Sequence, residues 1–155
     1  MIYILVALKA EAQAFVDKFK LKNYKNEKME VVISGIGSQK IYLASSIVVK
    51  KMKKDDLILN IGICGASTKY EIGELLDARK TTITSIDYEA KDDKYDVVDM
   101  ESAGFIDATK DIENSFIFKI VSDHFEPKSV TKDKAKKLIF NQIDEIMKKV
   151  GVCVS

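Results

Sequence analysis

The sequence is poor in the residues that build metal centres, disulfide frameworks and phosphate clamps. Its 155 residues include two cysteines, one histidine, one arginine, one proline and no tryptophan. Two cysteines make neither a disulfide framework nor a metal-ligand spacing, and any His-based metal cluster or Ser-His-Asp triad would depend on His124 alone. We therefore expect no metal or other cofactor, with Cys64 and Cys153 present as reduced thiols.

Two further absences bear on partners and location. Charged residues make up 32% of the chain at a net charge of +1, so no field of one sign favours nucleic acid or an anionic membrane surface. No apolar run approaches the roughly 20 residues needed to span a bilayer. The opening run MIYILVAL lacks a basic leader and continues into Lys9 and Glu11, which favours a first strand over a signal peptide. We therefore expect a cytoplasmic protein that binds neither nucleic acid nor a membrane.

What the sequence does contain is a regular alternation of strand and helix patterns. Apolar runs with the length of strands occupy residues 2–7, 30–34, 56–62, 81–86 and 115–122. Apolar residues at helical spacing occupy residues 8–19, 41–52, 101–110 and 131–149. The alternation predicts a single domain over residues 1–155, built as a three-layer α/β/α sandwich with a mixed, mainly parallel central sheet.

Acidic residues and glycine pairs follow the predicted strands. Glu11 comes after the first strand, Asp99 and Glu101 lie in DMES after the run DVV, and Asp123 follows the last strand. Paired glycines follow two other strands, in SGIGS (34–38) and GICGA (62–66). Because ligands of open α/β sheets bind outside the carboxyl ends of the strands, this shared placement predicts a site at that edge.

Each of these residues also has a purely structural interpretation. Asp99 could cap the following helix, and Glu101 could lie in its first turn, where the helix dipole favours negative charge. Asp123 could likewise cap a turn, and Glu11 could be an exposed helix residue. The glycines of SGIGS fit a tight turn as well as a phosphate-binding loop, because the full dinucleotide fingerprint is missing.

Five segments together resemble the nucleoside phosphorylase and nucleosidase superfamily, nearest to its methylthioadenosine/S-adenosylhomocysteine nucleosidases. They are VALKAEAQAF (6–15), VVISGIGSQK (31–40), LILNIGICGA (57–66), VVDMESAGF (97–105) and FKIVSDHFEP (118–127). The segments occur in the order of the family and cover most of the chain. The resemblance implies a nucleoside phosphorylase-like fold, a small-molecule nucleoside as the ligand and assembly as a homodimer.

The resemblance also implies a role for each acid. Cleavage of a purine N-glycosidic bond produces a ribosyl cation and a purine anion, so an acid with a raised pKa is needed to protonate N7 of the base. Asp123 matches that acid, Glu11 matches the base that activates water, and Glu101 would accept hydrogen bonds from the ribose hydroxyls. The other substrate-binding residues that the resemblance implies are Gly65, Met100 and Ser122.

Water is the expected nucleophile, because phosphorolysis needs cationic side chains that hold a phosphate dianion. The single arginine, Arg79, lies outside the matching segments, and Asn60 and Ile63 occupy positions at which phosphorylases of the family hold phosphate. The leading hypothesis is hydrolysis of a purine nucleoside or 5′-thionucleoside with release of the free base. The alternatives are a phosphate-dependent phosphorylase and a shortened, non-catalytic member that binds a nucleoside.

The chain departs from the family in length and at one charged position. Family members are longer, and the deficit falls within residues 75–97, a stretch that supplies an aromatic side chain stacked on the base and part of the subunit contact. Tyr88, Tyr95 and Phe125 are the candidate replacements for that aromatic, and Lys119 stands where the nucleosidases have arginine. We expect the shortened stretch to leave an apolar edge that a two-fold partner covers.

Overall fold

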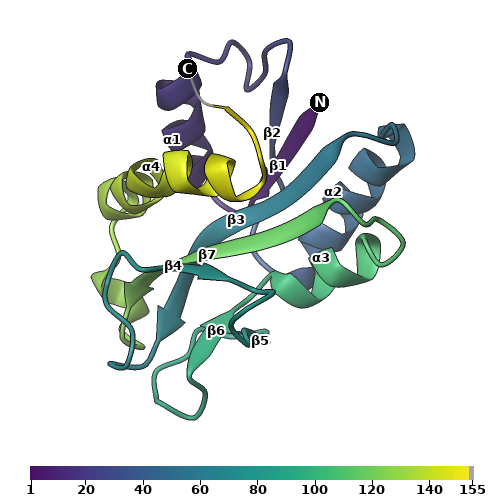
Figure 1. Cartoon of the computed structure of the whole chain (residues 1–155). Coiled ribbons are helices and arrows are strands. Elements are labelled where there is room, and N and C mark those ends of the chain that lie inside the picture. The colour runs from purple at the N-terminus through teal and green to yellow at the C-terminus, as the bar shows by residue number, and fades with distance from the viewer. Residues whose placement is uncertain (154–155) are drawn as a thin grey trace.

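The computed structural model describes residues 1–153, which form a seven-stranded sheet covered on both faces by helices (Figure 1). The strands are β1 (Ile2–Val6), β2 (Met29–Ile33), β3 (Leu57–Ala66), β4 (Leu75–Asp77), β5 (Thr84–Ser85), β6 (Val97–Asp99) and β7 (Ser115–Asp123). The helices are α1 (Lys9–Phe19), α2 (Ser38–Lys51), α3 (Ser102–Ala108) and α4 (Lys132–Lys149), and a 3-10 turn, η1, spans Pro127–Ser129. Among residues 1–153, no helix combines the length and apolar character needed to cross a membrane.

Strand β3 is the centre of the sheet. It runs parallel to β1 on one side and to β7 on the other, and β1 also pairs in parallel with β2. The short strands bring in the antiparallel pairs, because β4 lies antiparallel to β7 and β6 lies antiparallel to the end of β3. Strand β5 extends this part of the sheet by pairing in parallel with β6. The prediction of a mixed, mainly parallel sheet is therefore confirmed.

Different helix pairs bury the two faces of the sheet. Side chains alternate along a strand, so Ile4 of β1 packs in the core cluster of α1 and α4, and its neighbour Leu5 packs in the cluster of α2 and α3. Figure 1 shows α1 and α4 together on one face and α2 and α3 on the other. Helix α4 buries residues at helical spacing, namely Ala135, Ile139, Ile143, Ile146 and Met147. The three-layer α/β/α prediction is confirmed.

The strand boundaries differ from the sequence prediction in three places. The segment GICGA (62–66), expected as a glycine turn, continues β3 to Ala66, with a bulge between Cys64 and Gly65. The strand expected over residues 81–86 is reduced to Thr84–Ser85, because its partner β6 has only three residues. Strand β4 was not predicted, since three residues carry no readable alternation and are ordered by pairing with the edge of β7.

Candidate active site

A cavity of about 600 Å³ opens where β1, β3, β6 and β7 end. All six side chains or backbone positions expected at the site line it, namely Glu11, Gly65, Met100, Glu101, Ser122 and Asp123. They come from α1, β3, the turn before α3 and the end of β7, so only the folded sheet brings them together. The three carboxylates lie in one cleft, as expected from their positions after strands.

Glu11 is held at the start of α1 by backbone amides. Glu11 is only 2% exposed, so its interpretation as an exposed helix residue is wrong. Oε1 accepts hydrogen bonds from the N–H groups of Leu8 (2.8 Å) and Ala7 (3.1 Å), and Oε2 accepts one from Ile63 (2.9 Å). Burial raises the pKa of Glu11 from 4.5 to about 7, against the opposing effects of Lys119 and the backbone donors.

Asp123 both caps a turn and faces the cavity. Oδ2 accepts a hydrogen bond from the N–H of Glu126 (2.9 Å), as the capping interpretation proposed, and the carboxyl group also lines the cavity. Phe125 adopts a positive φ of 61°, which is uncommon for an aromatic residue and bends the chain back toward this carboxylate. The hydroxyl of Ser122 lies 2.6 Å from Asp123 Oδ1 and 3.1 Å from the carbonyl oxygen of Cys64. Asp123 is therefore fixed at both oxygens.

Glu101 is bound to the glycine loop that precedes α2. Gly35 and Gly37 have φ values of 88° and 106°, so the tight-turn interpretation of SGIGS is correct. The N–H of Gly37 donates to Glu101 Oε2 (2.9 Å), which occupies a donor that a phosphate would otherwise use. Burial raises the pKa of Glu101, and the opposing effects of Lys119 and the Gly37 N–H are smaller. Glu101 thus lies at the N-terminus of α3 but faces the cavity.

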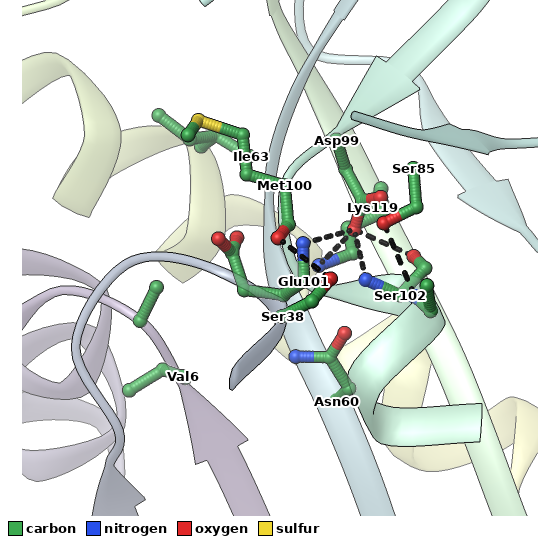
Figure 2. Close-up of polar contacts among 12 residues, drawn as sticks. Val6, Ser38, Asn60, Ile63, Ser85, Asp99, Met100, Glu101, Ser102 and Lys119 are labelled. Atoms are coloured by element: carbon green, nitrogen blue, oxygen red, sulfur yellow. Dashed lines mark hydrogen bonds and ion pairs between the residues drawn. The ribbon is translucent and has the colours of Figure 1, made fainter. Parts of the chain in front are cut away.

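A buried ion pair lies beneath these carboxylates, and sequence reasoning did not identify it (Figure 2). Lys119 Nζ lies 3.0 Å from Asp99 Oδ2, and both side chains are at most 1% exposed. Asp99 Oδ2 also accepts a hydrogen bond from the N–H of Ser102, the first residue of α3 (2.9 Å), although the N-cap position itself is Glu101 and not Asp99. Breaking such a buried pair by removing one partner typically costs about 3–5 kcal/mol. The signal in the sequence was a lysine inside the apolar strand FIFKIVS, because a lysine is fully buried only when it is paired.

One of the three candidate aromatics has access to the cavity. Tyr88 lines it and is 57% exposed. Phe125 is buried against Ile86 and Val98, and Tyr95 packs on the same cluster. Tyr88 is therefore the aromatic that could contact a bound base.

Arg79 lies at the other end of the sheet. Its guanidinium donates to the carbonyl oxygen of Ser115, the first residue of β7, and lies 4.0 Å from the ring centroid of Phe116. Asp123, at the cavity, is the last residue of the same strand. The only arginine of the chain is thus engaged away from the cavity.

The fold belongs to a known structural class, although neither a protein-family model nor a curated protein matches the sequence. That class is the nucleoside phosphorylase-like α/β fold of 5′-methylthioadenosine/S-adenosylhomocysteine nucleosidases. The structure is similar to that of a proposed nucleosidase of this type from Francisella philomiragia, with a TM-score of 0.75, 16% identity and coverage of 96% of this chain and 97% of the other.

Two further structures with the same fold contain bound inhibitors. The nucleosidase from Neisseria meningitidis, in complex with methylthio-immucillin-A, has a TM-score of 0.74, 15% identity and coverage of 96% of this chain and 98% of the other. The enzyme from Helicobacter pylori with butyl-thio-DADMe-Immucillin-A has a TM-score of 0.74, 15% identity and coverage of 96% of each chain. At this level of identity the likeness shows the fold, which the sequence resemblance predicted.

Proposed function

We propose that this protein hydrolyses the N-glycosidic bond of a purine nucleoside or 5′-thionucleoside and releases the free base. The observation that carries the proposal is the convergence of Glu11, Glu101 and Asp123 on one cavity, in a fold shared with methylthioadenosine/S-adenosylhomocysteine nucleosidases. The inhibitor complexes of two neighbours support a small-molecule nucleoside as the ligand. The two free cysteines, one of them buried, support a reducing compartment such as the cytoplasm.

Asp123 is suited to deliver a proton to the base because Ser122 can adapt to both of its protonation states. The Ser122 hydroxyl has one proton and two acceptors within reach, Asp123 Oδ1 and the Cys64 carbonyl oxygen. When Asp123 is ionised, the hydroxyl can donate to Oδ1 of the carboxylate. When Asp123 is protonated on Oδ2, the oxygen that could then donate to N7, the hydroxyl can still donate to Oδ1. Ser122 therefore orients Asp123 before and after the proton transfer to N7.

Glu11 is suited to activate water because its pKa of about 7 lies near a neutral working pH. Its two oxygens are fixed by three backbone N–H groups, so its position changes little when it gains a proton. Water deprotonated by Glu11 would attack C1′ of the developing ribosyl cation, while Glu101 accepts hydrogen bonds from the ribose hydroxyls. The negative charge of Glu101 would also favour the cationic sugar of the transition state.

Hydrolysis is favoured over phosphorolysis because no arginine lines the cavity, whose lysines, Lys9, Lys132 and Lys136, offer single ammonium groups in place of guanidinium forks. Arg79 contacts the opposite end of β7, and the buried Lys119 is paired with Asp99. A phosphate dianion needs unengaged donors next to the ribose, and arginine forks are the usual solution. Water needs only the carboxylate of Glu11.

The test is a panel of purine nucleosides and 5′-thionucleosides, incubated with purified protein in the presence and absence of phosphate. We expect release of the free base together with free ribose or 5-thioribose, at the same rate with and without phosphate. Base release that requires phosphate and yields ribose-1-phosphate would establish a phosphorylase. Binding by calorimetry without base release from any nucleoside would establish a non-catalytic binding protein, and the hydrolase proposal would then be abandoned.

A further inference from the structure

Two charged side chains meet at one glycine of the central strand, and a third pairs with one of them. A Cβ atom at Gly62 would lie 2.9 Å from Glu11 Oε2 and 3.4 Å from Lys119 Nζ, so both groups lie against the backbone of β3 at this residue. Lys119 Nζ is also 3.0 Å from Asp99 Oδ2. The buried ammonium therefore lies beside the candidate base and beside a second carboxylate that sequence reasoning treated as a cap.

Asp99 is connected to the rest of the site through a single oxygen atom (Figure 2). Besides Lys119, Oδ2 accepts hydrogen bonds from the N–H of Ser102 (2.9 Å) and from that of Glu101, at a longer 3.4 Å. The carboxylate of Glu101 in turn holds the Gly37 N–H. One buried carboxylate thus contacts both the ammonium beside Glu11 and the turn that carries Glu101.

The charges in this cluster do not balance locally. Lys119 is faced by Asp99 from β6, by Glu101 from the turn before α3 and by Glu11 from α1. Glu11 is faced by Lys119 and by Glu101. Burial lowers the pKa of Lys119, but the three carboxylates outweigh it and leave the pKa raised, so the lysine stays charged at neutral pH. One ammonium is therefore shared among three carboxylates.

We propose that Asp99 is a positioning residue, which anchors Lys119 beside Glu11 and fixes the turn that carries Glu101. Asp99 is also a lining residue of the cavity, but its side chain is fully buried and its Oδ2 is engaged by Lys119 and Ser102, so we assign its effect on the reaction to these neighbours. The proposal rests on the proposed hydrolytic function. It adds that the protonation of Glu11 depends on Asp99, because Asp99 and Glu11 both interact with the ammonium of Lys119.

Two substitutions should move the acid limb of the kcat/KM profile in opposite directions. In Asp99→Asn the amide oxygen can still accept the Ser102 N–H, but Lys119 loses one of its three carboxylates and acts more strongly on Glu11. The limb is expected to move to lower pH by about one unit. Lys119→Met keeps most of the length of the side chain and removes its charge, so the limb is expected to move to higher pH by about the same amount.

Asp56→Asn is the matched control. Asp56 is also a mostly buried carboxylate that accepts a backbone N–H, from Lys53, and pairs with an ammonium, the N-terminus of the chain. It immediately precedes β3 and does not line the cavity. This variant is expected to lower the melting temperature and to leave the pH profile in place. The conservative Lys119→Arg is expected to retain the profile of the wild type.

A direct titration of Glu11 separates this proposal from the proposed function. The ¹³C chemical shift of the Glu11 carboxyl carbon can be followed against pH in the wild type and each variant, and it requires no turnover. Displacements of opposite sign in Asp99→Asn and Lys119→Met support the proposal even if no nucleoside is cleaved. Unchanged midpoints in folded variants overturn it. If either variant does not fold, a Lys119→Arg protein with a displaced midpoint overturns it as well.

Discussion

At the scale of single residues, Asp123 is at once a turn cap and the candidate acid, and one substitution separates these roles. Asp123→Asn keeps an oxygen that can accept the Glu126 N–H but cannot supply an acidic proton. Turnover is expected to fall about 10²–10⁴-fold, with nucleoside binding and the melting temperature largely retained. Asp77→Asn is the control, because Asp77 accepts the Arg79 N–H in a turn away from the cavity. An Asp123→Asn enzyme with the turnover of the wild type would leave Asp123 as a turn cap only, a role worth about 0.5–2 kcal/mol.

The raised pKa of Glu11 leads to a second prediction, which concerns the stability of the protein and not its turnover. Its pKa is 4.5 in an unfolded chain and about 7 in the folded protein, so the folded state holds the proton more tightly between these values. The free energy of unfolding should therefore fall as pH rises from about 4.5 through 7, by up to about 3 kcal/mol from this group. The raised pKa of Glu101 acts in the same direction.

Urea unfolding of the wild type and Glu11→Gln at several pH values measures this contribution. The variant cannot ionise at this position, so its stability should depend less on pH between 5 and 8 than that of the wild type. In Glu11→Gln the side-chain NH₂ would face the Ile63 N–H, which is also a donor. This should make the variant less stable than the wild type at acidic pH. Parallel stability curves for the two proteins would show that burial of Glu11 has no such effect.

At the scale of elements, the contact between α2 and α3 depends on Gly104. A Cβ atom there would lie 1.9 Å from the carbonyl oxygen of Ser38, so α3 would have to move away from α2. Gly104→Ala is expected to lose at least about 1–3 kcal/mol of stability, although alanine is the better helix former by about 1 kcal/mol. The same movement should weaken substrate binding, since Ser38 donates to the Met100 carbonyl oxygen in the turn that lines the cavity.

The exposed neighbour Ala103 provides the comparison. Ala103→Gly changes helix propensity alone and is expected to cost about 1 kcal/mol without altering the Michaelis constant. Thermal melting and steady-state kinetics on both variants distinguish the contributions. A Gly104→Ala protein that is more stable than the wild type would mean that α2 and α3 are not held in this close contact.

The length of each element determined whether it could be predicted from the sequence. Long elements such as α4 and β7 were predicted to within a few residues, because their periodicity extends over several turns or an entire buried run. The acids after the strands were found because parallel strands end at a common edge. The Asp99–Lys119 pair was not found, since β6 and β7 do not pair directly and meet only around the end of β3. Local patterns do not encode that kind of contact.

At the scale of the whole molecule, the homodimer remains a prediction, and the structure suggests where to test it. Exposed large apolar side chains occur along β2, the glycine loop and α2, at Ile33, Ile36, Tyr42, Leu43 and Ile47. Within residues 75–97, where the contact was expected, Tyr88 is the one with comparable exposure. Ile36 also lines the cavity, so an interface over α2 would reach the site.

Light scattering at tens of micromolar is expected to show a dimer for the wild type and a monomer for Ile47→Lys. Ile47 is 66% exposed, so the lysine would leave folding unaffected but place a charge in the interface. Phe140→Lys changes an exposed apolar residue of α4, in the opposite layer, and should leave the dimer intact. A wild-type monomer, or dissociation by both substitutions alike, would contradict an interface over α2.

The packing of α1 on α4 has a consequence for the order in which the protein can form. Within residues 1–153 these are the first and the last helix, and they share one core cluster with the central strands. Contacts between such distant segments form late, because a long stretch of chain must first be closed into a loop. Glu11 is therefore synthesised early, but the layer that encloses its helix is completed only when the C-terminal helix has left the ribosome. Recovery of activity during refolding should for that reason lag behind recovery of helical circular dichroism.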